Sequence, residues 1–458
     1  MKRLDLILIS IFILLTFHAP AIGQESRHDT VALTSIRQFL EQGKVDIHAR
    51  TFMMSTMNDG GLSDYYAWAA GAGLGYQSPY YRHFQFGLSG FFIFNLADAH
   101  LAERDPITGA ANRYEKMLFN LQAPEEKREL DRLEELFLKY QTQRMTITLG
   151  RQKLNTPFLN EQDNRMRPNI FSGIWTEYRY GNMSFQNGWI TAITPRGTVD
   201  WYRLEDSFGV YGMGRNMNGE AAAYRGNMHS KGIWVSGISW YQQEKSKLKL
   251  WNYFIENVFN LSFVQWDQQL KKWKFGLQGF YETAIADAGN AVPALRYIQA
   301  GEKTAGIGTQ LGYQLGHTFL SANYLGISHS GRYLFPREWG GEQFYASLSR
   351  ERFEGNGGVQ AFSLKAESWL NHQHTRLTGG LGRVNLPGPE NYKLNKYGQP
   401  SYYHVMAEVS HTLEGMLEGM SAKILIVNKL DKNNTQEALY KINNVDMWNL
   451  NLIVDYKF

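Results

Sequence analysis

Residues 447–458, MWNLNLIVDYKF, alternate between two kinds of side chain along their whole length. Apolar and aromatic residues occupy every second position from Trp448 to Phe458, and the positions between them include asparagine, aspartate and lysine. Successive side chains of a β-strand point to opposite faces, so one face of this segment suits lipid and the other suits water. The pattern predicts an amphipathic strand with one lipid-facing side.

The same alternation recurs along most of the chain, for example at residues 44–50, 84–89, 273–278, 362–367 and 403–410. A soluble β-sandwich also alternates. Here, however, aromatic residues recur near the expected strand ends, as the girdles of membrane barrels require, and the inward faces carry charges and glycines rather than a packable core. These features favour an all-β, antiparallel transmembrane β-barrel.

The strand count predicts eighteen strands. Nineteen segments are candidates, but bacterial single-chain barrels have even strand numbers, short periplasmic turns and longer external loops. The turns counted from the two ends agree only if residues 343–350 are not a wall strand, which makes residues 326–358 one long external loop. The other long external loops are expected at residues 95–134, 152–173, 194–231 and 283–303. Eighteen strands enclose a water-filled lumen, which inward-folded loops would narrow.

The N-terminal residues predict export. Lys2 and Arg3 precede an apolar core, and small residues at positions 21–23 form a cleavage site. The core is shorter than the ~20 residues of a spanning helix, so an N-terminal membrane anchor is the weaker alternative. We therefore expect a signal peptide at residues 1–23, a periplasmic N-terminal segment at 24–43 and the barrel at 44–458.

Composition excludes several functions. The 458 residues include no cysteine, so disulfides, thiol chemistry and cysteine-based metal sites are excluded. The 47 Lys and Arg residues are nearly balanced by 43 Asp and Glu residues and form no dense basic stripe, so nucleic acid is not an expected partner. No metal site and no cofactor are expected.

Three groups of motifs carry a family resemblance. They are GRQ (150–152) with TPF (156–158) and DNRMRPN (163–169), PREWG (336–340) with RER (350–352), and NKYGQPSYY (395–403). In this order they resemble motifs of the OprD family of outer-membrane porins. The resemblance implies a monomeric eighteen-stranded barrel in the outer membrane of a Gram-negative bacterium. It also implies a basic track along the pore wall and two inward-folded loops that select small solutes bearing a carboxylate.

Two sets of charged residues are candidates for the pore. Fixed cations along a narrow path can compensate an anion for lost hydration. By the alternation, the inward-facing candidates for a pore basic track are Lys44, Arg50, Lys139, Arg144, Lys274, Lys365, Arg376 and Lys423. The candidates in the two constriction loops are Glu161, Asp163, Arg165 and Arg167 in the first, and Arg337, Glu338, Arg350 and Arg352 in the second. Selection of solutes and anchoring of the loops to the wall remain equally open for these loop charges.

The expected function is passive, substrate-selective diffusion of small hydrophilic solutes, with amino acids, small peptides and organic acids as candidates. Other expected partners are outer-membrane lipid and the barrel-assembly machinery, because the strand with Tyr456 and Phe458 resembles a barrel-assembly signal. The alternative is a barrel enzyme of serine-peptidase or lipase type. Serine-peptidase activity has been described for members of the resembled family, but no G-x-S-x-G motif locates a nucleophile here. We therefore expect no catalytic residues.

Overall fold

The computed structural model describes residues 35–99, 101–127, 130–162, 165–242 and 245–458. The expected signal peptide and the candidate Asp163 lie outside the described residues. The expected periplasmic segment is described from Ser35 onward and contains the short helix α2 (Ile36–Glu41). Its N-terminus is capped by Ser35, whose Oγ accepts a hydrogen bond from the backbone N–H of Gln38 at 3.2 Å.

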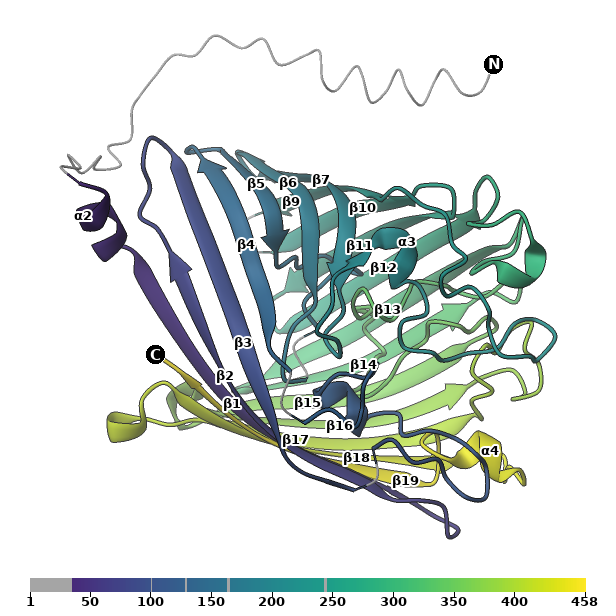
Figure 1. Cartoon of the computed structure of the whole chain (residues 1–458). Helices are drawn as coiled ribbons and strands as arrows, with labels where there is room; N and C mark the ends of the chain where they lie inside the picture. Colours follow the sequence, from purple (N-terminus) through teal and green to yellow (C-terminus); the bar gives the residue numbers. More distant parts are fainter. Residues whose placement is uncertain (1–34, 100, 128–129, 163–164, 243–244) are drawn as a thin grey trace, which may run out of the picture.

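The described residues form one antiparallel sheet of nineteen strands (Figure 1). One of them, β8 (Tyr202–Arg203), is a two-residue addition to the end of its neighbour, which leaves eighteen wall strands. In chain order these are β1 (Lys44–Asn58), β2 (Tyr65–Gln77), β3 (Phe84–Ala99), β4 (Arg132–Gln141), β5 (Met145–Gln152), β6 (Ile170–Tyr180), β7 (Met183–Thr194), β9 (Ile233–Gln242), β10 (Ser246–Ile255), β11 (Phe259–Leu270), β12 (Trp273–Ala284), β13 (Lys303–Leu315), β14 (Thr318–Ile327), β15 (Gln360–Leu370), β16 (Thr375–Asn385), β17 (Tyr402–Thr412), β18 (Met420–Asp431) and β19 (Met447–Lys457).

The sheet closes on itself. Each wall strand pairs with the next along the chain, β7 pairs directly with β9, and β1 pairs with both β2 and β19. Phe52 of β1, for example, lies opposite Ala69 on one side and Ile453 on the other. Closure gives every strand a partner on both sides, which is what a sheet in hydrocarbon requires. The predicted eighteen-stranded barrel is confirmed.

The terminal strand has the two faces that its sequence predicts. Trp448 and Leu452 are 51% and 42% exposed on the outer surface, whereas Asn449 and Asn451 are fully buried on the inner face. Residues 343–350 form no strand and belong to the loop between β14 and β15, as the strand count predicts. The outer face therefore meets lipid, and the inner face meets the contents of the lumen.

Helical elements are few and short. Apart from α2, they are α3 (Leu204–Ser207), α4 (Ala438–Lys441), and the 3-10 turns η1 (Glu115–Leu118), η2 (Pro293–Leu295), η3 (Asn371–Gln373) and η4 (Gly415–Leu417). None of the helices in the described part of the chain is long and apolar enough to cross a membrane.

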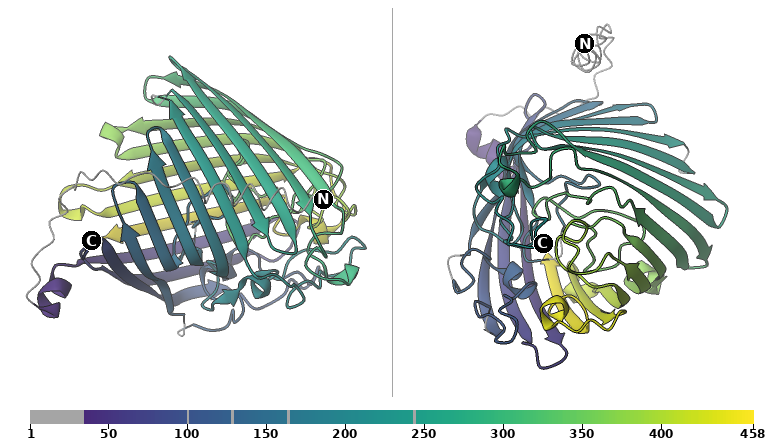
Figure 2. Two further views of the ribbon diagram at one scale, coloured as in Figure 1. Left: turned by 90° about the horizontal axis from the view of Figure 1, so that it is seen from above. Right: turned by 90° about the vertical axis from the view of Figure 1, so that its right-hand side faces the viewer.

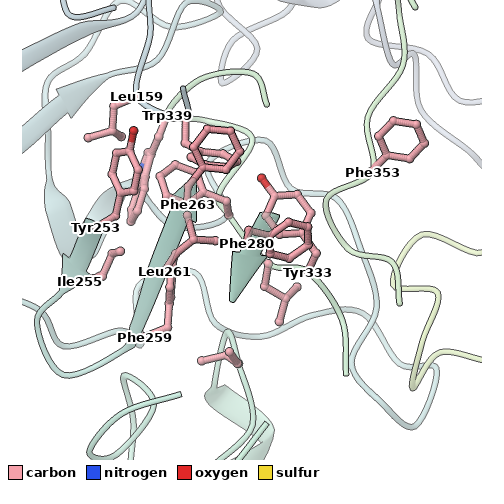
Figure 3. Packing of buried hydrophobic residues seen from close by; sticks show 14 of the residues in the cluster. Leu159, Tyr253, Ile255, Phe259, Leu261, Phe263, Phe280, Tyr333, Trp339 and Phe353 are labelled. Carbon is pink, nitrogen blue, oxygen red and sulfur yellow. The ribbon is translucent and has the colours of Figure 1, made fainter. Parts of the chain in front are cut away.

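The long loops gather at one end of the sheet, opposite α2 and the C-terminus, and several enter the ring of strands (Figures 1 and 2). There they pack on the wall through an apolar core (Figure 3). Phe158 of the β5–β6 loop has its ring 5.2 Å from that of Phe263 on β11, and 5.4 Å from that of Phe335 in the β14–β15 loop. Tyr253 and Phe280 extend this core along β10 and β12.

This core corrects one expectation. The alternation predicts inward faces without a packable core, but the inner faces of β10, β11 and β12 are apolar and aromatic. A second buried cluster packs the β3–β4 loop on β1 to β3, with Phe52, Phe91 and Phe119 among its members. The periodicity alone cannot show this, because aromatic residues occur on both faces of these strands. The loops thus fill much of the lumen and leave a narrower path.

Candidate functional site: a cationic eyelet

A small cavity of about 80 Å³ lies where the inward-folded loops meet. We call it the eyelet and define it by its lining residues. They come from five loops and β18, rather than from the two loops expected: Arg113, Tyr114, Met117, Gln162, Arg165, Arg196, Tyr211, Met213, Arg337, Arg350, Glu351, Arg352, Gln399 and Lys429. Six arginines and one lysine thus face a single carboxylate, Glu351, among the described residues of this lining.

Two of the loops are locked together beside the eyelet. Gly340 has a φ of +157°, and a Cβ there would lie 2.1 Å from the carbonyl oxygen of Phe158, so only glycine allows this approach. The Asn160 side chain both accepts from the Gly341 N–H at 3.0 Å and donates to the Gly341 carbonyl oxygen at 2.8 Å. The motifs TPF and PREWG therefore meet and fix the position of the eyelet.

Four eyelet cations, Arg113, Arg196, Arg350 and Lys429, hydrogen-bond to neutral oxygens alone among the described residues. Arg350 donates from Nε to the Asn449 side-chain oxygen at 3.1 Å and also to that of Asn451. The Lys429 ammonium donates to the carbonyl oxygen of Arg350 at 2.9 Å. These asparagines come from β19, so the wall positions Arg350 without neutralising it.

Arg113 and Arg196 are held in the same way. Arg113 donates to the Asn443 carbonyl oxygen at 3.4 Å and to the Asn444 side chain. Arg196 donates to the Gln162 carbonyl oxygen at 3.2 Å. Within the described residues, none of the four cations forms a salt bridge. Across the described ranges, the eyelet therefore holds positive charge that no salt bridge to these four cations compensates.

Burial and mutual repulsion lower the pKa values of two of these arginines but leave both charged. Burial, together with the nearby Arg165, lowers the pKa of Arg196 to about 9. Burial, together with the nearby Arg196, lowers the pKa of Arg350 to about 10. Both values stay well above 7, so both guanidinium groups are charged at neutral pH. An anion that enters the eyelet relieves this repulsion.

The remaining arginines of the constriction loops have partners that hold the loops. Arg337 donates to Glu354 at 2.7 Å and stacks 3.7 Å from the Tyr397 ring, and Lys396 approaches the same carboxylate at 3.1 Å. Burial acts to raise the pKa of Glu354, but Lys396 and Arg337 outweigh it and lower this pKa to about 2. Glu354 is therefore ionised and joins the β14–β15 loop to the β16–β17 loop.

We call Arg337, Glu354, Lys396 and Tyr397 the loop frame. The other candidate residues lie around it. Arg352 forms a salt bridge of 2.7 Å with Glu342, and buried Arg167 donates to the carbonyl oxygens of Leu130 and Phe119. The carbonyl oxygen of Arg165 accepts a hydrogen bond from Arg50 at 2.6 Å. Glu338 accepts one from the Tyr211 N–H at 3.1 Å, and Glu161 lies 4.0 Å from Lys153. The structure brings Arg165, Arg337, Arg350 and Arg352 to the eyelet, but not Arg167, Glu338 or Glu161.

The basic track predicted along the wall is largely paired with carboxylates. Its salt bridges are Lys44 with Asp46 at 2.6 Å, Arg50 with Asp455 at 2.6 Å, Lys274 with Asp267 at 3.9 Å, and Arg376 and Lys423 with Glu408 at 2.9 and 3.9 Å. Lys365 donates to the Ser347 carbonyl oxygen at 2.7 Å. Lys139 and Arg144 lie 5.0 Å and 5.9 Å from the rings of Phe137 and Tyr180. Arg144 is in the β4–β5 turn rather than on a strand.

Three eyelet cations, Arg113, Arg196 and Lys429, are not among the residues predicted from the sequence. Lys429 lies on the same face of β18 as Lys423, so the alternation that selected Lys423 could have found it. Lys396 and Tyr397, which hold Glu354, lie within the motif NKYGQPSYY. Arg113 and Arg196 lie in irregular loops, where no periodicity marks the direction of a side chain. No group of three or more possible metal ligands occurs among the described residues.

A closed barrel of eighteen strands with an inward-folded, charged constriction defines an outer-membrane diffusion channel. A family model described as "outer membrane porin, OprD family" matches residues 37–356. The chain therefore belongs to the OprD family of outer-membrane porins. It is a channel for passive diffusion of small solutes across the outer membrane of a Gram-negative bacterium, and not an enzyme.

Solved structures agree in fold. The chain is similar to OpdK of Pseudomonas aeruginosa, solved with vanillate, with a TM-score of 0.67 and 15% identity over 92% of this chain and 99% of that one. It is similar to OccK2 (OpdF) of the same species, in complex with glucuronate, with a TM-score of 0.67 and 16% identity over 92% and 99% of the two chains. For OccK8 (OprE) of P. aeruginosa the TM-score is 0.71, with 15% identity and the same coverage. A search of curated proteins found no match.

Proposed function

We propose that this channel conducts small solutes that bear a carboxylate, and that the eyelet selects them. The observation that carries the proposal is the set of four eyelet cations, Arg113, Arg196, Arg350 and Lys429, whose hydrogen-bond acceptors among the described residues are all neutral. A carboxylate can accept from two guanidinium groups at once and forms the stronger, charge-assisted kind of hydrogen bond. Two structural neighbours were solved with vanillate and glucuronate, and both ligands are carboxylates.

The geometry also supports passage rather than trapping. Each of the four cations already has a neutral oxygen as a partner, so a passing carboxylate exchanges contacts instead of filling an empty shell. Selective conduction needs binding that is strong enough for entry and weak enough for exit. With about 80 Å³ available, the eyelet admits the charged group of a solute ahead of its body.

The wall track has a secondary role in this proposal. Arg50, Lys274, Arg376 and Lys423 each lie within 4.0 Å of a wall carboxylate, so they offer an anion a weaker, screened attraction. Lys365, whose ammonium donates to the Ser347 carbonyl oxygen and forms no salt bridge within the described residues, is the member of the track best placed to attract an anion beyond the eyelet.

Single-channel recording in planar bilayers tests the proposal. Benzoate, benzamide and benzylammonium have nearly the same shape and differ in charge, so block by each isolates the role of the carboxylate. We expect a reversal potential that shows anion preference in a KCl gradient, and block by benzoate alone. Cation preference, or equal block by benzamide, would overturn the proposal.

A further inference from the structure

A second and larger cavity, of about 750 Å³, lies among the external loops beside the eyelet. We call it the vestibule. It is lined by the β3–β4, β7–β9, β16–β17 and β18–β19 loops. Its lining contains six cations: Arg104, Arg113, Lys116, Arg215, Arg225 and Lys396. No Asp or Glu belongs to the described part of this lining. A cavity of this size holds a molecule much larger than benzoate.

Most of the vestibule cations have neutral partners, like those of the eyelet. Arg104 donates to the Gly109 carbonyl oxygen at 2.8 Å, and Arg215 donates to that of Gly219 at 2.6 Å. Arg225 donates to the side-chain oxygen of Gln122. Lys116 forms no salt bridge within the described residues, and burial together with the charge of Arg104 lowers its pKa. Among the described contacts of these six cations, Lys396 alone forms a salt bridge, with Glu354.

The vestibule and the eyelet adjoin each other. Arg113, Tyr211 and Met213 line both cavities, so one side chain, Arg113, presents positive charge to each. An extended solute can therefore have one group in the eyelet while the rest of it occupies the larger cavity.

The geometry points to the vestibule as a binding site for organic anions with two or more carboxylates, held while one carboxylate enters the eyelet. This inference rests on the proposed carboxylate selectivity of the eyelet and extends it from single to multiple charges. Linked charges bind more tightly than single ones, because the first contact raises the effective concentration of the second group at its site. The uncompensated vestibule cations also raise the local concentration of anions at the mouth.

Block measurements with three sugars test the inference. Galacturonate carries one carboxylate, trigalacturonate carries three, and maltotriose has a similar size without charge. Added on the external side, trigalacturonate should block at a concentration at least about tenfold below that needed for galacturonate, and maltotriose should not block. Equal concentrations for the two uronates, or equal block by maltotriose, would overturn the inference.

Paired variants locate the site. Arg104→Gln/Lys116→Gln removes two vestibule charges outside the eyelet and should reduce the advantage of trigalacturonate over galacturonate to about threefold or less. Lys231→Gln removes an exposed charge that lines neither cavity and should leave the advantage unchanged. If the double variant is folded, as heat-modifiable migration verifies, and the advantage of trigalacturonate is unaltered, the vestibule is not the binding site. Benzoate block would then persist if the eyelet proposal holds and be absent if that proposal also fails.

Discussion

The eyelet and the barrel wall both carry many cations, but their partners differ. On the wall, Arg50 meets Asp455 at 2.6 Å, and Arg376 meets Glu408 at 2.9 Å. In the eyelet, Arg350 meets two asparagines, and Arg196 meets a carbonyl oxygen. A count of basic residues treats the two regions as equal. The pairing indicates that the field felt by a solute is concentrated at the eyelet.

The difference follows from backbone geometry. Neighbouring strands place side chains of the same face a few ångströms apart, so a carboxylate on one strand easily reaches a cation on the next. Glu408 on β17 reaches Arg376 on β16 and Lys423 on β18 in this way. At the eyelet, Arg196 instead meets the backbone carbonyl oxygen of Gln162 and Arg350 meets asparagine side chains, and these neutral groups hold a guanidinium group without cancelling its charge.

Reversing one eyelet charge should have the largest effect on selectivity. Arg350→Glu replaces an uncompensated cation with a carboxylate beside Glu351, so an entering anion loses a charge-assisted hydrogen bond and meets repulsion. We expect loss of anion preference in a KCl gradient and benzoate block weakened at least tenfold, since hydrogen bonds to charged groups contribute about 1.5–3 kcal/mol. Arg350→Gln should lie between this variant and the wild type. Unchanged reversal potentials in both would show that the eyelet does not select.

Removing the carboxylate that holds the loop frame should affect stability first. Glu354→Gln leaves Arg337 and Lys396 buried without their shared partner, a change that costs about 3–5 kcal/mol in other buried pairs. We expect a lower thermal unfolding temperature and noisier open-channel currents, measured by heat-modifiable migration and by bilayer recording. A matched change, Glu390→Gln in an exposed part of the β16–β17 loop, should alter neither. Equal behaviour of the two variants would contradict the anchoring role of Glu354.

Removing a wall carboxylate should make the wall modestly more attractive to anions, as the eyelet is. Glu408→Gln frees Arg376 and Lys423 at once, so anion preference should rise by less than the Arg350 variants lower it, because both cations remain partly exposed and screened. Arg376→Gln removes a charge that is already paired and should change the reversal potential less than Glu408→Gln does. If the Arg376 variant has the larger effect, pairing is not what distinguishes the wall from the eyelet.

Sequence reasoning predicts the wall better than the site for a physical reason. Period-two alternation is imposed on every strand by lipid on one side, so Trp448, Leu452 and their counterparts mark strand and face together. The β14–β15 loop could also be recognised, because an even strand count leaves no place for residues 343–350 in the wall. The inner aromatic core around Phe158 could not, since its partners come from loops and strands far apart in sequence.

For the eyelet, the motifs identify the correct loops but not the roles of their charges. Arg337 and Arg350 lie thirteen residues apart in one loop, yet Arg337 is paired with Glu354 and Arg350 forms no salt bridge within the described residues. That distinction depends on which neighbouring loop supplies a carboxylate, and contacts between loops leave no periodic signal. Arg113 and Arg196, which complete the uncompensated set, belong to no motif that the sequence analysis singled out.

The smallest effect on the channel current is expected from acidification. This experiment tests the loop frame around Glu354 rather than the eyelet cations. Lys396 and Arg337 lower the pKa of Glu354 to about 2, against an ordinary value near 4.5. Because the folded-state pKa is the lower one, the stabilisation is complete above about 4.5 and is lost only as the pH falls toward 2. Open-channel noise should therefore be the same at pH 7 and pH 4, measured with benzenesulfonate as blocker because it stays ionised throughout. Noise that rises to the level of Glu354→Gln already at pH 4 would show that Glu354 is protonated there. Lys396 and Arg337 would then lower its pKa less than their contacts indicate.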